Sequence, residues 1–485
     1  MAATAMEAKR LGLANKSMII VPKHLVEQTA IEFQRLYPNA NILAATKKDF
    51  QQENRKKFCT RIATHNFDVV IMSYSQFEKI PLSKERKEAI LQEQIAMITE
   101  AIQKMRSERS GSGTDRFSIK QMEKMRKELQ ANFQKLQEEN QDDVIAFETL
   151  GIDRLFVDEA HYFKNLFTPT KMTNVAGISN AAAKKSTDLF DKCQYINEKT
   201  NYRGIVFATG TPVSNSMTEL FNFSRYLRPD RLEEKGLSFF DAWASTFGQT
   251  INSFELKPEG KGFQNKTRFA KFYNLPELMS LTKEFMDVKT PDMLNLPVPN
   301  FEVIVETVPP STQQKTMINA LVERAEAVRS GSVNAEADNM LNITNEGRKI
   351  ALDVRVMDAA LPDHPDSKIN RCVRNVVKIY QETREQQSTQ LIFCDSSTPK
   401  KGAFNVYDDI KGKLITQGVK KEEIAFIHDA ATDEQKEALF EKVRQGTIRI
   451  LLGSTDKLGV GTNVQDKLIA SHDLDVPWRP SDLEQ

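Results

Sequence analysis

Short apolar runs, separated by longer stretches with helical spacing, recur along the chain. A short and wholly apolar run is typical of a strand buried on both faces of a sheet, and intervening helices favour parallel pairing. The first half contains the runs Ser17–Pro22, Ile42–Ala45, Val69–Met72, Arg154–Val157 and Gly204–Ala208, and the second half contains Gln390–Cys394, Ile424–Ile427 and Ile448–Leu452. The pattern predicts an α/β protein with two doubly wound parallel sheets.

Residues 83–147 interrupt this alternation. Apolar residues there step by four and three positions, the spacing of a coiled-coil seam, at Leu91, Ile95, Ile98, Ile102 and Met105. A Ser-Gly-Ser-Gly break at 110–113 precedes a second stripe at Met122, Met125, Leu129, Phe133 and Leu136. We predict an antiparallel helical hairpin ~30 Å long, whose charged residues are either a solvated face or a contact for nucleic acid or protein.

The domain boundaries follow from these patterns. Residues 1–229 are predicted to form the first lobe, 230–300 a helical sub-domain and connector, and 301–485 the second lobe. Within the second lobe, the alternation at 301–306 predicts a strand, and helices are expected at 311–329 and 348–360. The Ser/Asn/Glu-rich segment 330–346 between those helices is predicted to be mobile.

The strand ending at Val157 leads directly into two carboxylates, Asp158 and Glu159. In open α/β sheets, ligands bind just beyond the carboxyl ends of the strands. A first carboxylate there can hold Mg²⁺ through water, and a second can orient or deprotonate an attacking water. The alternative interpretation is a strand that simply ends in solvated acids.

Two further strands end in loops whose residues could bind a phosphate or another ligand. The strand at 204–208 runs into Thr209, Gly210, Thr211 and Pro212, and hydroxyls in such a turn can hydrogen-bond a phosphate, although an ordinary Gly-Pro turn fits equally well. The strand at 448–452 is followed by the glycine-containing loop 453–463, which lets backbone approach a ligand closely.

Composition narrows the class of protein. Charged residues make up 27% of the chain and the net charge is only +1, so a nucleic-acid partner must meet local basic surfaces. The four cysteines form no Cys-x-x-Cys pair, which argues against a zinc ribbon or disulfide framework and favours a reducing cytoplasm. We find no apolar run of membrane-spanning length and no basic-then-apolar secretory signal.

Taken in order, the motifs resemble those of superfamily-two helicases, and within them the Swi/Snf-type DNA translocases. The resemblance covers nearly the whole chain and looks closest to helicase regions of phage and conjugative elements, often fused to adenine DNA methyltransferases. The matching residues, from motif Ia to the segment before motif VI, are Ile20–Pro22 with Leu25 and Gln28; Ser73–Ser75; Asp158–His161 (the DEAH box) with Lys164 and Asn165; Thr209–Pro212 with Asn215; Leu391–Cys394; Ser454, Thr455, Gly459, Gly461 and Asn463; and Trp478–Pro480.

The resemblance implies two RecA-like lobes that bind ATP and Mg²⁺ between them and step along the backbone of DNA. It assigns catalysis to Asp158, Glu159 and His161, with Asp158 holding Mg²⁺ through water. Coupling falls to Thr209, Gly210, Thr211 and Pro212, and the nucleotide-facing part of lobe 2 to Gly459, Gly461 and Asn463. The implied DNA contacts, which would be independent of base sequence, are Pro22, Lys23, Ser73, Tyr74, Ser454, Thr455 and Lys457.

Two departures from the family pattern limit this expectation. No Gly-x-x-x-x-Gly-Lys-Ser/Thr phosphate loop occurs in the sequence, and the arginines of motif VI would fall just beyond Gln485. We therefore expect a fragment of an ATP-dependent DNA helicase or translocase with weak or no turnover by itself. The alternative is a non-catalytic DNA-binding or scaffold protein with the same two-lobe shape. A metal-dependent nuclease is a poor third interpretation, because no further acid or histidine cluster accompanies the two carboxylates.

Overall fold

The computed structural model describes residues 1–107, 113–138, 145–168, 170, 172, 175, 178, 183–213, 216–257, 263–294, 299–334, 337–400, 402–459 and 462–477. The chain divides into two compact units. The first comprises Met1–Ser253 and Asn265–Asn295, and the second comprises Phe254–Gln264 and Leu296–Gln485. Each unit has its own parallel sheet and its own apolar core, as the sequence predicted.

The first unit contains a five-stranded sheet in the order β2-β3-β1-β4-β5, with every pair parallel. β1 and β3 are buried along their whole length, which explains their apolar sequences. The strands are β1 (Ser17–Val21), β2 (Ile42–Ala44), β3 (Val69–Ser73), β4 (Arg154–Val157) and β5 (Ile205–Phe207). The helices that accompany them are α1 (Ala2–Arg10), α2 (Val26–Leu36), α3 (Gln52–Thr64), α4 (Tyr74–Phe77), α7 (Lys184–Thr200) and α8 (Thr218–Leu227).

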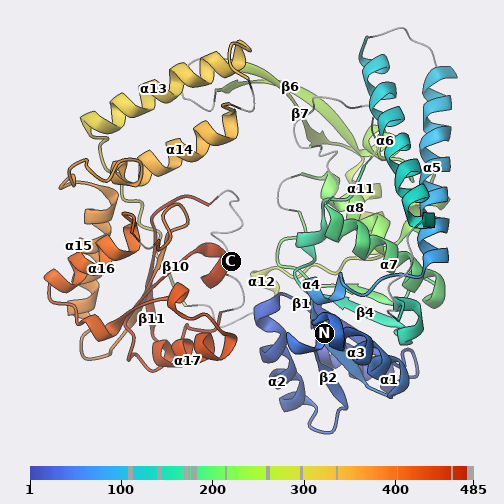
Figure 1. Ribbon diagram of the computed structural model, residues 1–485, viewed down its shortest axis with the longest axis horizontal. Coiled ribbons are helices and arrows are strands. Elements are labelled where there is room, and N and C mark those ends of the chain that lie inside the picture. The colour runs from blue at the N-terminus through green and yellow to red at the C-terminus, as the bar shows by residue number, and fades with distance from the viewer. Residues whose placement is uncertain are drawn as a thin grey trace. The chain divides into compact units, whose positions relative to one another are not determined.

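The inserted hairpin consists of α5 (Lys84–Ser107) and α6 (Gly113–Glu138), which run side by side away from the sheet (Figure 1). Its apolar contact includes Ile98, Ile102 and Met122, and Ile119 and Leu129 pack against them. The 3–4 spacing therefore did predict a helical pair. The base of α5 is tied to α7 by an ion pair between Arg86 and Glu198.

A separate aromatic cluster forms the end of the first unit. It is built by α8, α10 and α11, and its largest buried side chains are Phe221, Phe240, Trp243 and Phe247. The elements here are α9 (Pro229–Glu234), α10 (Phe240–Phe247), α11 (Leu275–Lys283), α12 (Pro291–Leu294) and a two-stranded sheet of β6 (Gly248–Leu256) and β7 (Phe263–Phe272). A helical sub-domain and connector were predicted here. The β6–β7 hairpin, whose residues 254–264 belong to the second unit, was missed because most of its apolar residues face solvent and form no buried run.

The second unit contains a four-stranded parallel sheet in the order β11-β8-β10-β9. Its strands are β8 (Thr389–Phe393), β9 (Ile424–Phe426), β10 (Ile450–Gly453) and β11 (Leu468–Asp473), and its helices are α13 (Thr312–Arg329), α14 (Met340–Leu352), α15 (Lys368–Glu382), α16 (Val406–Thr416), α17 (Asp433–Arg444) and α18 (Thr455–Leu458). α15 shows why such helices form: Ser367 caps its first turn, and Ile369, Val373, Val376 and Val377 face the core.

Three local predictions in the second unit were wrong. Residues 301–306 are not a strand, and Phe301, Val303 and Val305 are exposed, because alternation without a partner strand cannot satisfy the backbone. The helix expected at 348–360 begins at Met340, where the side chain of Asn339 accepts a hydrogen bond from Asn342 N, and it ends at Leu352. The predicted mobile segment 330–346 therefore contains the first turns of α14. The sequence pattern also missed β11.

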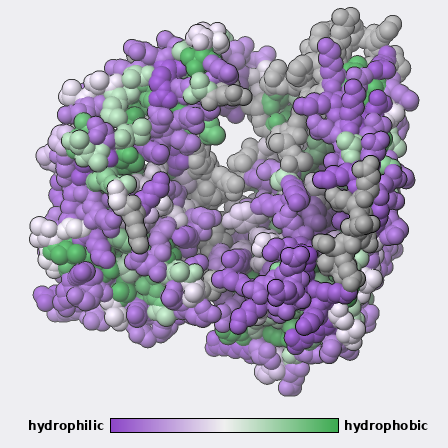
Figure 2. Space-filling model, viewed as in Figure 1, coloured by the Kyte–Doolittle hydropathy of each residue, from purple (hydrophilic) through white to green (hydrophobic). Residues whose placement is uncertain are grey.

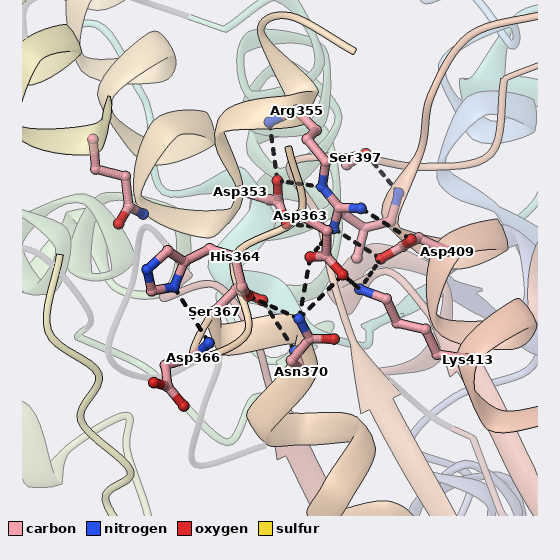
Figure 3. A network of polar contacts seen from close by, with 12 residues as sticks. Asp353, Arg355, Asp363, His364, Asp366, Ser367, Asn370, Ser397, Asp409 and Lys413 are labelled. Carbon is pink, nitrogen blue, oxygen red and sulfur yellow. Dashed lines mark hydrogen bonds and ion pairs between the residues drawn. The ribbon is translucent and has the colours of Figure 1, made fainter. Parts of the chain in front are cut away.

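A polar network fastens α14 and the turn after it to α16 (Figure 3). The guanidinium of Arg355 makes paired hydrogen bonds to the carboxylates of Asp353 and Asp409 and lies 3.1 Å from an oxygen of Asp363. Lys413 contacts Asp363 and Asp409 at 2.8 and 2.7 Å. Because Arg355 is largely buried, these contacts are stronger than those of a surface ion pair.

Candidate functional site

The carboxyl ends of four strands in the first unit carry the candidate residues. Register pairs Ile20 with Val157, Val21 with Ser73, and Val157 with Phe207. Pro22, Ser73, Asp158 and the turn after β5 therefore follow adjacent strands at one edge of the same sheet. This placement supports the argument from strand ends, since parallel strands bring their carboxyl ends together.

The segment after β4 is held tightly by backbone contacts to both neighbouring strands. Asp158 N donates to Ile20 O (2.9 Å), and Ala160 N donates to Ala208 O (3.0 Å). Between them Glu159 adopts a left-handed conformation with φ 45° and ψ 48°. A non-glycine residue in this region is uncommon and clusters at functional sites. The turn directs the chain away from the sheet into the short 3-10 helix Ala160–Phe163.

His161 links this acidic segment to the threonine turn. Its Nδ1 lies 3.0 Å from Thr209 Oγ1 and 3.1 Å from Glu159 Oε2, and the ring is buried. Thr211 N in turn donates to Thr209 Oγ1 at 3.1 Å. Glu159, His161, Thr209 and Thr211 thus lie one after another within 3.1 Å of each other through these polar atoms.

The electrostatics at Asp158 favour a cation. Burial raises the pKa of the Asp158 carboxyl above its ordinary value, and the neighbouring charge of Glu159 raises it further. Across the described part of the chain, no group of three or more His, Cys, Asp or Glu side chains is arranged to hold a metal by itself. Mg²⁺ suits such a site, because it commonly keeps several waters and takes one or two carboxylates together with substrate phosphates. Asp158 is the residue that would hold it.

Tyr74, which is predicted to contact DNA, has partners within the first unit. Its hydroxyl donates to the backbone carbonyl of Asp158 at 2.6 Å, and its ring packs edge-on against Phe163 at 5.0 Å. Burial and the nearby Asp158 and Glu159 raise its pKa. Tyr74 therefore positions the acidic segment from the neighbouring α4, a contact between sequence-distant residues that the sequence pattern did not reveal.

The remaining predicted residues of the first unit vary in exposure. Pro22 is buried, and Lys23 is exposed at the start of the next 3-10 helix. Ser73 is buried and bonds Gln76 through both its backbone N and its hydroxyl. Gly210 is exposed, and Thr211 and Pro212 are half-buried. Asn215 lies outside the described residues.

Lys164, which follows the acidic box, makes structural contacts. Its ammonium pairs with Glu219 at 2.8 Å in a buried ion pair, and Asn222 Nδ2 donates to its carbonyl at 2.9 Å. These contacts pack the segment after the box against α8. In the structure, Lys164 therefore acts as a packing residue.

In the second unit, the residues after β10 are held by a carboxylate that the sequence reasoning missed. Thr455 donates to Asp395 through its backbone N (2.8 Å) and its Oγ1 (2.9 Å). Asp475 in turn accepts from the backbone N–H groups of Asp395 and Ser396. Asp395 follows β8 directly, so the strand-end rule that selected Asp158 could also have found it.

The loop after β10 contains further residues that were predicted to contact DNA or the nucleotide. Ser454 is buried, whereas Lys457 is exposed, and its charge adds to burial in lowering the pKa of His428. Gly459 lies against the carbonyl of Thr455, where an added Cβ would come within 2.6 Å. Asn463 is exposed, and its carbonyl accepts from Arg444. Gly461 and Trp478–Pro480 lie outside the described residues.

The site geometry agrees with the comparison to protein families. The family described as "Probable helicase domain" matches residues 1–290, and "Helicase conserved C-terminal domain" matches residues 368–485. The chain belongs to the helicase family. Both candidate strand-end groups of this helicase-family chain, after β4 and after β10, fall within the matched residues.

The individual proteins that resemble this chain share little sequence identity with it. The "Defense against restriction protein B" of Escherichia phage P1 is 22% identical over 306 residues, which are 61% of this chain, and the match spans only 13% of the phage protein. The SWI2/SNF2 ATPase core of Sulfolobus solfataricus in complex with dsDNA is 14% identical, with a TM-score of 0.31 over 97% of this chain and 79% of that one. The Pyrococcus furiosus Hef helicase domain is 12% identical, with a TM-score of 0.30 over 100% and 85%.

The four cysteines, Cys59, Cys193, Cys372 and Cys394, are buried free thiols. Among the helices of the described residues, none combines the length and the apolarity needed to cross a lipid bilayer.

Proposed function

We propose that this chain is part of an ATP-dependent DNA translocase or helicase of the Swi/Snf type, and that the edge of the first sheet is its nucleotide-hydrolysis site. The observation that carries the proposal is the contact chain from Glu159 through His161 to Thr209 and Thr211. It joins an acidic strand end to a hydroxyl turn on the adjacent strand, which is the arrangement needed to couple chemistry at a phosphate to movement.

In this proposal Asp158 would hold Mg²⁺ through water, and the bound ion would supply positive charge to the phosphates of ATP. Glu159 orients and deprotonates the attacking water. His161 contacts both Glu159 and Thr209 through Nδ1 and so links the acidic segment to the turn. Thr209 passes a change in that segment to the backbone of Thr211, and the turn shifts when the terminal phosphate leaves.

DNA is the proposed partner, bound through its backbone and without base specificity. The exposed Lys23 and Lys457 follow β1 and β10 and are suited to phosphate contacts. Ser73 and Tyr74 are proposed to support this surface indirectly, because their polar atoms are engaged within the first unit. A fused or partner adenine DNA methyltransferase, a mobile-element origin and a cytoplasmic location remain part of the proposal by the family resemblance.

The test measures phosphate release in the presence of DNA. We propose near-background turnover for these 485 residues alone, because their sequence contains no phosphate loop to hold the β and γ phosphates. When a segment carrying a Gly-x-x-x-x-Gly-Lys-Thr loop is joined ahead of residue 1, DNA should stimulate release. Glu159→Gln should then lower the rate roughly 10²- to 10⁴-fold, the usual contribution of a general base.

Glu53→Gln serves as the matched control, since Glu53 is an exposed glutamate on α3 of the same unit. Equal rates for Glu159→Gln and Glu53→Gln in the extended chain would refute the hydrolysis site. Robust DNA-stimulated release by the 485 residues alone would instead refute the dependence on a phosphate loop.

A further inference from the structure

Three neighbouring strands of the second unit end at one level of its sheet. Register places the last residues of β8, β10 and β11 opposite one another. Asp395, Thr455 and Asp475 each lie two residues beyond the last residue of their strand. Parallel strands bring their carboxyl ends to the same edge. These three side chains are therefore neighbours, although they come from three separate stretches of the sequence.

Both hydrogen-bond donors of Thr455 are directed at Asp395. The backbone N–H of Thr455 donates to Asp395 Oδ1 at 2.8 Å, and its hydroxyl donates to Asp395 Oδ2 at 2.9 Å. A threonine has one backbone N–H and one hydroxyl hydrogen, and an ionised carboxylate only accepts. Thr455 therefore has no further donor to offer a second anion in this arrangement, although the residue is only half-buried.

Asp475 holds Asp395 from the neighbouring strand on the other side. Its carboxylate accepts from the backbone N–H of Asp395 at 2.9 Å and from that of Ser396 at 2.6 Å. Asp475 is itself buried. The backbone of Asp395 is thus fixed by one strand end while its side chain bonds another. The contact between Asp395 and Thr455 belongs to a chain of hydrogen bonds across three strand ends, and it is not made by a loose surface side chain.

The charge at this edge of the sheet is negative. Hydrophilic residues cover most of the molecular face in Figure 2, and the whole chain carries only +1, so the local charge decides whether a polyanion can approach a given surface. Burial, Asp475 and Asp395 together raise the pKa of Asp473. The ten residues that follow the three strands contain three Asp and one Lys, a net charge of −2; they are 394–397, 454–457 and 474–475.

We infer that Asp395 is a positioning residue that keeps Thr455 from binding DNA, because its carboxylate occupies the two donors that a DNA phosphate needs. The loop after β10 binds the DNA backbone through Thr455 only when Asp395 releases those donors. This inference rests on the proposed DNA-directed function, in which the family resemblance assigns Thr455 to the DNA backbone. Asp395 itself lies outside the helicase motifs identified in the sequence, and it makes the DNA contact of the second unit reversible.

The experiment measures the affinity of the complete 485-residue chain for a fluorescent DNA duplex of about 30 base pairs by anisotropy. Asp395→Asn removes the negative charge and keeps the size of the side chain. It should raise the affinity roughly 10-fold, because the donors of Thr455 become available to a phosphate, and hydrogen bonds to a charged group are the stronger kind.

Asp456→Asn is the matched control, since Asp456 is an exposed aspartate next to Thr455 in the sequence. It removes the same charge from the same loop but leaves both hydrogen bonds from Thr455 to Asp395 in place. Its affinity for the duplex should stay within about threefold of the parent's, because water and salt screen an exposed charge.

Two further variants separate the occupation of Thr455 from a structural effect of Asp395. Asp395→Ala removes both acceptors and should also raise the affinity, so the result does not depend on the folding of one variant. Asp395→Asn/Thr455→Val removes the released hydroxyl, and most of the gain should disappear. A purely structural Asp395 would instead give a lower melting temperature together with an equal or lower affinity for the duplex.

The outcomes distinguish this inference from the proposed function. If the parent chain binds the duplex and Asp395→Asn binds it no more tightly than Asp456→Asn, the inference is overturned and the proposed function stands. A gain that persists in full in Asp395→Asn/Thr455→Val also overturns the inference, because the gain then comes from charge alone. If the parent, Asp395→Asn and Asp395→Ala all fail to bind the duplex, the proposed function fails and the inference fails with it.

Discussion

At the residue scale, Nδ1 of His161 contacts two motifs at once. It lies within 3.1 Å of both Glu159 Oε2 and Thr209 Oγ1, residues fifty positions apart in the sequence. Both contacts run through the same nitrogen of a buried ring. The acidic box and the threonine turn therefore meet at one side chain, although the sequence shows them as two separate motifs.

At the residue scale, His472 is predicted to make the stability of the folded protein depend on pH. Burial lowers its pKa to about 4. Its Nε2 lies 3.0 Å from Gln390 Oε1, and Gln390 Nε2 donates to Val376 O, so the histidine nitrogen carries the proton of a neutral ring. The unfolded chain takes up a proton below about pH 6.5, whereas the folded chain does not until about pH 4. Stability should therefore be fully present above pH 6.5 and fall as the pH drops towards 4.

His472→Gln should remove this acid sensitivity, which amounts to about 1–3 kcal/mol of unfolding free energy. Urea unfolding between about pH 4 and pH 7, monitored by circular dichroism, measures it. His65→Gln is the control, since His65 is exposed in the first unit, and it should keep the pH dependence of the parent. Parallel loss of stability in the parent and His472→Gln would contradict the assignment.

At the scale of elements, Arg355 determines how α14 is fastened to the second sheet's helices. Its guanidinium makes paired hydrogen bonds to Asp353 and Asp409 (Figure 3). It also lies 4.7 Å from the centre of the Phe404 ring. One side chain thus connects the end of α14 with α16. The pair α13–α14 has its own small apolar cluster, and Leu352 at the end of α14 also packs in the core of the second sheet, so the network adds a polar attachment to an apolar one.

Arg355→Ala should lower the unfolding free energy of the second unit by about 3–5 kcal/mol, because it leaves buried carboxylates without their cation. Arg355→Met should cost less, since it keeps much of the packing volume. Chemical denaturation followed by a probe in the second unit measures both. Arg374→Ala is the control, as Arg374 is an exposed arginine of α15 with a 3.6 Å ion pair to Asp366. If Arg374→Ala lowers the unfolding free energy as much as Arg355→Ala does, the buried network contributes no more to stability than a surface ion pair.

At the scale of the whole molecule, each unit has a core of its own. Ile19 lies in a buried cluster of the first sheet, and Ile392 lies in one of the second. Units with separate cores are expected to unfold as separate cooperative transitions.

Differential scanning calorimetry should therefore resolve two transitions. Ile392→Ala should lower one melting temperature and Ile19→Ala the other, because each removes a buried side chain at a cost of about 2–5 kcal/mol to its own unit. A single transition that both variants shift equally would show that the units fold as one.

The sequence predicted the positions of those candidate residues that directly follow a buried strand. Asp158, Glu159, Thr209 and Thr211 follow apolar runs, and parallel pairing brings such ends to one edge whatever the details of packing. The contacts of Tyr74 with Asp158 and of Asp395 with Thr455 were not foreseen. These contacts join side chains and backbone of different elements, and no local sequence pattern encodes how close two elements come in the fold.

By itself, the sequence determined the α/β class, the paired helices of the insertion and the family, because buried strands and amphipathic helices leave periodic apolar signatures. Tertiary structure alone decided that residues 301–306 stay unpaired, that α14 begins at Met340, and that β6 and β7 form an exposed hairpin. The reason is physical: a strand exists only where a second strand accepts its backbone hydrogen bonds, and exposure depends on what the rest of the chain leaves uncovered.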